Sequence, residues 1–132
     1  MIPNFRVYNK TTKLMYPVKF ISYPLRTVHC INKHGLYLSE ETFYLTREEI
    51  VLMQSTGLKD KNGVEIFDGD VVNFMVPNQM ISGTYQIRQA KSGEWRLDNR
   101  VQGRPLYISG SYHCEVVGNV WEDGDLLESV EE

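Results

Sequence analysis

The sequence lacks a long apolar segment and a leader-like start. No apolar run approaches the roughly 20 residues that a membrane helix needs, because charged side chains such as Lys19, Asp68 and Asp70 interrupt the most apolar stretches. The first four residues have neither the basic nor the apolar region of a secretory signal. These absences predict a protein that stays in the cytoplasm and makes no contact with a membrane.

Cysteine is scarce, with Cys30 and Cys114 far apart and outside any Cys-x-x-Cys spacing. In a reducing cytoplasm such thiols are expected to be small buried hydrophobic residues, and a disulfide or a reactive thiol is the alternative. Each cysteine follows a histidine, in His29-Cys30 and His113-Cys114, which suggests zinc. Neighbouring side chains on a strand point to opposite faces, so each pair offers one ligand to a shared site. Even with His34 the set falls short of the four ligands of structural zinc, and we expect no metal and no cofactor.

Motifs of catalysis and phosphate binding are absent as well. There is no Gly-x-Ser-x-Gly elbow and no protease context around either cysteine. The turn at residues 57–63 is not followed by the Gly-Lys-Ser/Thr of a phosphate loop. The acidic residues between positions 60 and 70 fail the spacing of a calcium-binding EF-hand. Asp and Asn in turns serve to bind backbone N–H groups, and the sequence therefore predicts a protein that is not an enzyme.

The net charge of −3 is unevenly distributed. Residues 122–132 hold six acidic and no basic side chains, whereas the preceding residues hold 14 basic against 11 acidic ones. An acidic end of this kind is typical of a frayed, solvated terminus, and it can also screen a basic surface.

Short β-like segments, broken by Gly, Asn and Pro, recur along the whole chain. Their spacing predicts a mainly-β fold with a small antiparallel barrel. We expect an N-terminal β-meander over residues 1–50 and the barrel with its acidic tail over residues 51–132. The one helical signal is the capping box from Thr46 to Glu49, ahead of an apolar run that suits a buried strand equally well. We expect at most one or two short helical turns there.

Residues 81–113 combine cations with aromatic side chains. In small nucleic-acid-binding barrels, cations follow the phosphates and aromatic rings stack on bases. The alternative is that the aromatic residues belong to the core and the cations lie on a solvated hairpin. The possible nucleic-acid contacts are Arg88, Lys91, Trp95, Arg96, Arg100 and Arg104.

Residues 53–72 carry a long, specific pattern of turn and apolar residues. A second pattern, with Gly118 and Asn119, occupies residues 116–122, and the chain opens with an aromatic-basic-aliphatic-aromatic run at residues 5–8. Together they resemble the YopX family of phage and prophage proteins. One departure is Asp123-Gly124, where the family commonly has Asn-Pro, and both pairs favour a turn. The central pattern consists of Gln54, Thr56, Gly57, Leu58, Asp60, Gly63, Ile66, Gly69 and Asp70.

The resemblance implies a fold related to SH3-like barrels, a phage or prophage origin, and a family without an assigned activity. It carries over no catalytic residues. We expect a non-catalytic module that binds itself, as a homo-oligomer, or another protein, because apolar edge strands at Leu14–Ile21 and Ile81–Ile87 would need a cover. Nucleic-acid binding is the alternative.

Overall fold

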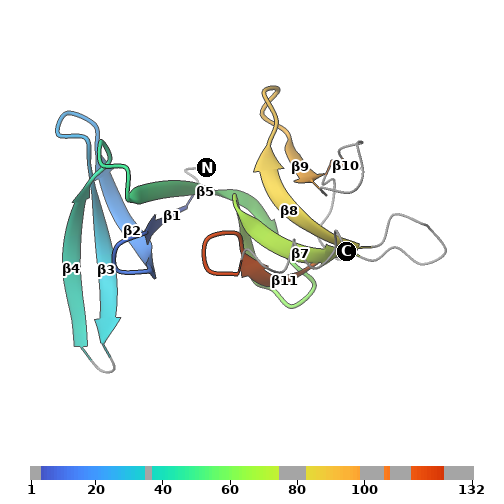
Figure 1. The fold of residues 1–132 in the computed structure, drawn as a ribbon, viewed down its shortest axis with the longest axis horizontal. Helices are drawn as coiled ribbons and strands as arrows, with labels where there is room; N and C mark the ends of the chain where they lie inside the picture. The colour runs from blue at the N-terminus through green and yellow to red at the C-terminus, as the bar shows by residue number, and fades with distance from the viewer. Residues whose placement is uncertain (1–3, 35–36, 75–82, 99–105, 108–113, 124–132) are drawn as a thin grey trace. The chain divides into compact units, whose positions relative to one another are not determined.

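All regular structure in this computed structural model is β (Figure 1). It describes residues 4–34, 37–74, 83–98, 106–107 and 114–123. No described segment forms a helix long and apolar enough to cross a membrane. The region of the Thr46 capping box is a pair of turns, in which Arg47 N–H donates to Tyr44 O and Ile50 N–H donates to Arg47 O, both at 3.2 Å. The mainly-β prediction is confirmed, and residues 46–49 form turns instead of a helix.

The chain divides into two compact units, Met1–Gln54 and Ser55–Glu132. The first unit is an antiparallel meander in which each strand pairs with its neighbours in the order β4-β3-β2-β1-β5. Its strands are β1 (Phe5–Asn9), β2 (Leu14–Ser22), β3 (Thr27–His34), β4 (Tyr37–Tyr44) and the first half of β5 (Ile50–Lys59).

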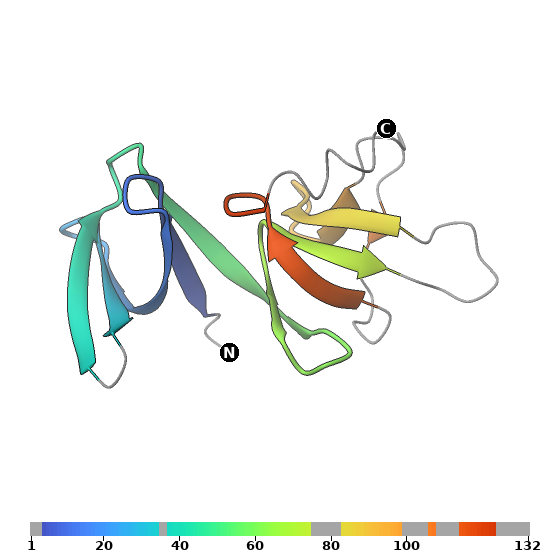
Figure 2. The same cartoon turned by 60° about the horizontal axis from the view of Figure 1, so that its bottom comes forward.

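The second unit contains an open five-stranded sheet with the order β10-β9-β8-β7-β11 (Figure 2). The second half of β5 pairs separately with β6, through Ser55 and Phe67 and through Lys59 and Glu65. The outermost strands, β10 and β11, do not pair with each other, so the expected small antiparallel barrel is not closed among the described strands. The strands are β6 (Glu65–Phe67), β7 (Asp70–Phe74), β8 (Gly83–Gln89), β9 (Trp95–Asp98), β10 (Leu106–Tyr107) and β11 (Cys114–Asn119).

Each unit has its own hydrophobic core. In the first unit, Val7, Tyr16, Val28 and Cys30 are buried together, and the rings of Tyr16 and Phe43 meet edge to face at 5.0 Å. In the second unit the buried cluster is Ile66, Val72, Tyr85, Ile87, Leu97 and Cys114. The two cores belong to different units of the chain, the first before residue 55 and the second after it.

The two segments expected to be open edges are interior strands. β2 lies between β1 and β3, and β8 lies between β7 and β9, with residues 81 and 82 outside the described residues. β2 achieves this with a shift of register between Val18 and Phe20, so that its first half pairs with β1 and its second half with β3. The long edge strand of the first unit is instead β4.

The turn after β5 depends on the left-handed backbone of Gly63, whose φ is +81° and whose N–H donates to Asp60 O at 3.0 Å. A Cβ at this position would meet no atom within 4 Å, so any cost of substitution is conformational. We expect Gly63→Ala to lower the free energy of unfolding by about 1 kcal/mol, and Gly63→Asn to lower it less. Urea titration measures both, and a Gly63→Ala protein as stable as the wild type would contradict the proposed turn strain.

Candidate interaction surface

The carboxylate of Asp60 organises the turn that follows β5. Oδ1 accepts the N–H groups of Asn62 (2.8 Å) and Val64 (2.9 Å), and Oδ2 accepts the N–H of Val116 in β11 (2.9 Å). Asp60 is only 6% exposed. Burial pushes the pKa of this carboxyl upward, but the three N–H donors and the charge of Lys61 outweigh burial, and the pKa is lowered below its ordinary value.

The same turn covers the edge of β11. Lys61 N–H donates to Cys114 O at 3.0 Å, and the Lys61 ammonium lies 2.9 Å from the Glu115 carboxylate. Together with the bond from Val116 to Asp60, these contacts occupy backbone groups of β11 that do not serve its pairing with β7. This edge of the second unit is therefore not available for pairing at these positions.

Five further residues of the central motif lie in β5 and β6. Thr56 donates its hydroxyl to Ile66 O at 2.8 Å and accepts the N–H of Leu58 at 3.0 Å. Gly57 has a φ of +81°, and Gln54 pairs with Phe5. Ile66 is fully buried, and Leu58 packs against the same core. These residues hold backbone and core together.

Gly69 and Asp70 of the central motif, and Gly118 and Asn119 of the second motif, also fix backbone turns. Asp70 is buried and accepts the N–H of Phe67 at 2.8 Å, while Gly69, with a φ of +87°, donates to Ile87 O at 2.9 Å. Asn119 Oδ1 accepts the N–H groups of Trp121 and Glu122 at 3.0 and 2.9 Å. A Cβ on Gly118 would lie 2.6 Å from Asp123 Oδ2, which explains why a side chain does not fit there.

The basic segment separates its cations from its aromatic residues. Arg88 and Arg96 are direct cross-strand partners in β8 and β9, and both form ion pairs with Asp98, at 3.4 and 3.0 Å. Tyr85 is fully buried and Trp95 packs against the same core. Lys91 is exposed in the turn between β8 and β9, and Arg100 and Arg104 lie outside the described residues. The described part brings Arg88 and Arg96 together with the carboxylate of Asp98, and it places Tyr107 of β10 at the register position opposite Arg96.

The two cysteines are free thiols, each fully buried in the core of its own unit. Burial, with a smaller contribution from Glu41 for Cys30 and from Asp60 for Cys114, raises the pKa of each thiol to about 11. His29 points away from Cys30 and meets the hydroxyls of Thr27 and Thr42, both at 3.1 Å. Among the residues that the structure describes, no group of three or more His, Cys, Asp or Glu could hold a metal ion.

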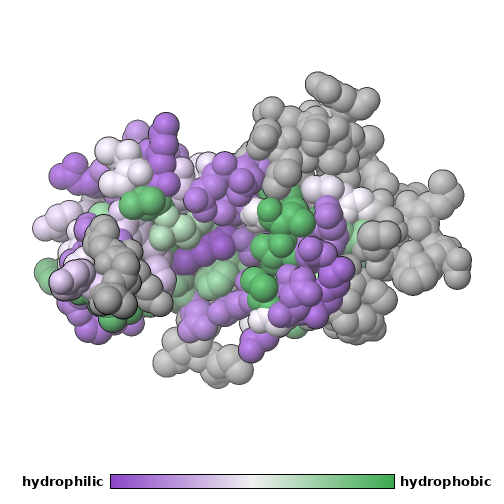
Figure 3. Space-filling model, turned by 90° about the horizontal axis from the view of Figure 1, so that it is seen from below, coloured by the Kyte–Doolittle hydropathy of each residue, from purple (hydrophilic) through white to green (hydrophobic). Residues whose placement is uncertain are grey.

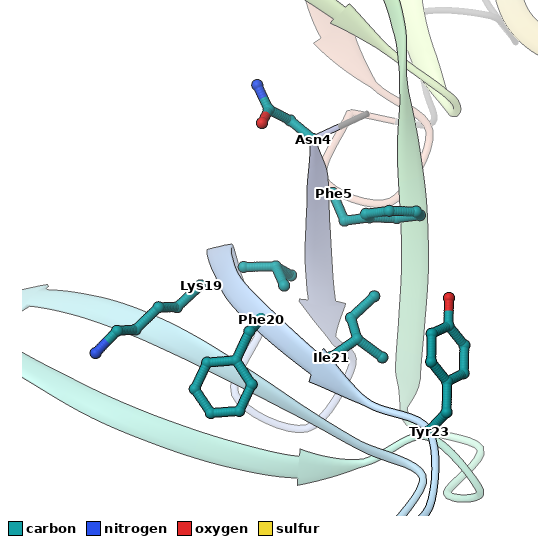
Figure 4. Close-up of a pocket in the computed structure, with 7 residues that line it drawn as sticks. Asn4, Phe5, Lys19, Phe20, Ile21 and Tyr23 are labelled. Atoms are coloured by element: carbon teal, nitrogen blue, oxygen red, sulfur yellow. The ribbon is translucent and has the colours of Figure 1, made fainter. Parts of the chain in front are cut away.

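A pocket of about 430 Å³ lies in the first unit where β2 leaves β1 to pair with β3 (Figure 4). Its lining offers apolar and aromatic groups and no carboxylate or thiol, and its one cation, Lys19, forms an ion pair with Glu40. Such a lining suits an apolar side chain better than a reaction. The lining residues are Asn4, Phe5, Val18, Lys19, Phe20, Ile21 and Tyr23.

Large apolar side chains are exposed mainly on the first unit. Among the described residues the second unit exposes three of them. On the face shown in Figure 3, hydrophobic residues form small groups among hydrophilic ones. The seven on the first unit are Leu14, Phe20, Tyr23, Leu25, Tyr37, Leu38 and Tyr44. The sequence predicts a β-meander in this part of the chain, but it does not identify the edge strand, because edge position depends on the pairing order of the whole sheet.

The open antiparallel sheets and the structural use of the motif residues define a two-unit, all-β class of protein. The chain belongs to the YopX protein family, whose model matches residues 4–128. It is similar in structure to protein EF1440 from Enterococcus faecalis, with 25% identity and a TM-score of 0.56 over 96% of this chain and 99% of that one. It is also similar to protein yopX from Bacillus subtilis, with 16% identity and a TM-score of 0.63 over 94% and 97% of the two chains. No curated protein matches its sequence.

Replacing Asp60 with Asn should lower stability in a pH-dependent way. The amide keeps one acceptor but places a donor against a backbone N–H, at an expected cost of about 1–3 kcal/mol at pH 7. Because the folded-state pKa is lowered, the carboxylate's contribution is complete above the unfolded pKa of about 3.9 and is lost as the pH falls through the folded-state value.

Urea titrations at pH 7, 5 and 3 should show the difference between wild type and Asp60→Asn shrinking at the lowest pH. The exposed carboxylate of Glu94 supplies the control, since Glu94→Gln should change stability little at any of these values. A difference that is constant with pH would contradict the role of the charged Asp60.

The buried thiols should react with iodoacetamide only after unfolding. At neutral pH a thiol with a pKa of about 11 has a very small thiolate fraction, and the folded chain also blocks access. Mass spectrometry should find Cys30 and Cys114 unmodified in the native protein and both modified in denaturant. Rapid native labelling of either cysteine would show that it is accessible and reactive.

Proposed function

We propose that this YopX-family chain is a non-catalytic protein-interaction module that binds its partner through the first unit. The observation that carries the proposal is β4, an eight-residue edge strand with exposed apolar side chains. Tyr37, Leu38 and Tyr44 are 79%, 68% and 54% exposed. An exposed edge strand presents unpaired backbone groups and is a template for pairing with another chain.

The chemistry of the motif residues and of the two cysteines supports a binding role rather than a reaction. Asp60, Asp70 and Asn119 use their side-chain oxygens to accept backbone N–H groups in turns. The thiols of Cys30 and Cys114 are buried and have raised pKa values, which disfavours nucleophilic attack. The proposed setting, a phage- or prophage-encoded accessory protein in the bacterial cytoplasm, rests on the sequence resemblance.

Self-association is a second form of the same proposal. The edges first expected to drive it lie inside their sheets, so a homo-oligomer would have to use β4 or another surface of the first unit. Nucleic-acid binding is the second candidate function, and it rests on the adjacent cations Arg88 and Arg96. Asp98 neutralises part of their charge, and Tyr85 and Trp95 belong to the core, so these two rings do not offer a stacking surface beside the arginines. Tyr107, the register partner of Arg96, is the aromatic residue that favours this candidate.

A comparative capture experiment tests this proposal. Immobilised wild-type protein is exposed to a lysate of the cells that encode it, next to a variant with Tyr37→Ser, Leu38→Ser and Tyr44→Ser. A control carries Val64→Ser and Val117→Ser, which remove exposed apolar residues from the second unit. We expect the wild type and the control to retain a protein in a nuclease-resistant manner, and the variant to lose it. Retention that nuclease abolishes, or that the variant preserves, would contradict the proposal.

A further inference from the structure

We infer that the outer edge of β4 binds an extended basic segment of a partner protein as an added strand. The inference rests on the proposed function and specifies the partner. Among the described residues, β4 has one neighbour in its sheet, β3, and the two strands pair over all eight positions without a bulge. The opposite edge of β4 is therefore regular and long enough for a second ladder.

The direction of the backbone groups follows from the pairing. Leu45 N–H donates to Arg26 O at 2.8 Å, next to the pair formed by Thr27 and Tyr44. In an antiparallel ladder, hydrogen-bonded and non-hydrogen-bonded pairs alternate. Counting along β4 from Leu45, the residues whose N–H and C=O groups point away from β3 are Leu38, Glu40, Thr42 and Tyr44. These residues form the outer edge of β4.

Apart from the charges of Glu40 and Glu41, the usual protections of an edge are missing from β4. Natural edge strands are guarded by proline, lysine, bulges or a covering loop. The residues of β4 include neither proline nor lysine, and six of its eight positions are exposed. In contrast, β11 is covered by the Asp60 turn, and β6 has only three residues. The first half of β5, residues 50–54, pairs with β1 alone and leaves a shorter edge on the other side of the first unit. Among the described strands, the outer edge of β4 is thus the longest one without a pairing partner.

The charges on β4 specify what can pair with it. Glu40 and Glu41 are consecutive, so their side chains lie on opposite faces of the sheet at its centre. Glu40 forms an exposed ion pair with Lys19, and Glu41 accepts a bond from the Asn32 amide at 3.3 Å. Opposite charges directly across a strand pair stabilise it, and like charges destabilise it. A complementary strand therefore carries two consecutive basic residues, flanked by β-branched or apolar residues beside Leu38 and Tyr44.

The same charges disfavour a second copy of the chain as the occupant. In an antiparallel pair of two β4 strands, outer-edge residues of one copy must lie opposite outer-edge residues of the other. In the two registers that overlap most, either Glu40 or Glu41 then lies directly opposite the same residue of the other copy. The four carboxylates gather at the centre of the ladder, where Lys19 beside Glu40 is the cation that the first unit places in contact with them. The charge pattern thus selects a basic strand from a different protein.

The test uses two labelled synthetic peptides, Val-Thr-Val-Lys-Arg-Val-Thr-Val and the same peptide with Glu-Glu at its centre. Fluorescence anisotropy at physiological salt should show the basic peptide binding at least tenfold more tightly than the acidic one. Thr42→Pro removes an N–H of the outer edge and should weaken binding of the basic peptide at least tenfold. Thr42→Val is the matched control, since both substitutions lose the Thr42 hydroxyl that meets His29, and it should bind within about twofold of the wild type.

Non-specific attraction of a basic peptide to an acidic protein would be insensitive to Thr42→Pro. Equal binding of the two peptides, equal binding by Thr42→Pro and Thr42→Val, or no binding by the wild type would each overturn the inference. Circular dichroism and the melting temperature check that Thr42→Pro is folded. If Thr42→Pro is unfolded, two versions of the basic peptide are used in its place, one N-methylated at its odd positions and one at its even positions. An added strand donates the N–H groups of one of these two sets to β4, so at least one of the methylated peptides must lose binding. Unchanged binding by both peptides would overturn the inference.

Three further outcomes separate this inference from the proposed function. If Thr42→Pro still captures the lysate protein that the Tyr37, Leu38 and Tyr44 variant loses, strand addition is wrong and the interaction module stands. If light scattering finds a wild-type dimer that Thr42→Pro converts to a monomer, a second copy occupies the edge and the basic partner is wrong. Failure of the wild type to capture any protein would contradict the proposed function itself.

Discussion

One buried carboxylate, that of Asp60, holds the second unit together at the point where sequence-distant segments meet. It accepts N–H groups from Asn62 and Val64 in its own turn and from Val116, which is 56 residues away. A single anion thus fixes the turn, attaches it to the last described strand and keeps three backbone donors satisfied in a nearly water-free place. Because the attached turn runs along β11, the same contact also closes that edge to other chains.

With the edge of β11 closed in this way, the outer edge of β4 is the longer edge that remains open. The outer edge of β4 has the length, the regular register and the exposed side chains that β11 and β6 do not offer. Edge strands in general tend to pair with other chains. Because Glu40 and Glu41 lie at the centre of β4, this edge favours a basic partner strand and disfavours pairing with a second copy of itself. In this account the two units have different roles, with motif residues stabilising the second unit and the first unit presenting the binding edge.

Local features of this protein could be predicted from its sequence, and pairing order could not. The mainly-β fold, the turn at Gly63, the burial of Cys30 and Cys114 and the family resemblance all follow from short patterns. The expected barrel is not closed among the described strands, and the open edges expected at β2 and β8 were wrong. Both depend on sheet order, which is set by long-range contacts such as the pairing of β1 with β5. The separation of Arg88 from Tyr85 could have been predicted from the sequence, since two residues at an odd spacing on a strand point to opposite faces of the sheet.

Residue-resolved amide hydrogen exchange, measured by NMR with and without the basic peptide, tests the central claim most directly. In the free protein the outer-edge amides of Leu38, Glu40, Thr42 and Tyr44 should exchange fast, while those of Ser39, Glu41 and Phe43 are protected by the ladder to β3. Saturation with the peptide should slow the outer set and leave the inner set unchanged. Outer-edge amides that are already protected in the free protein, or that exchange equally fast in the complex, would contradict strand addition at β4.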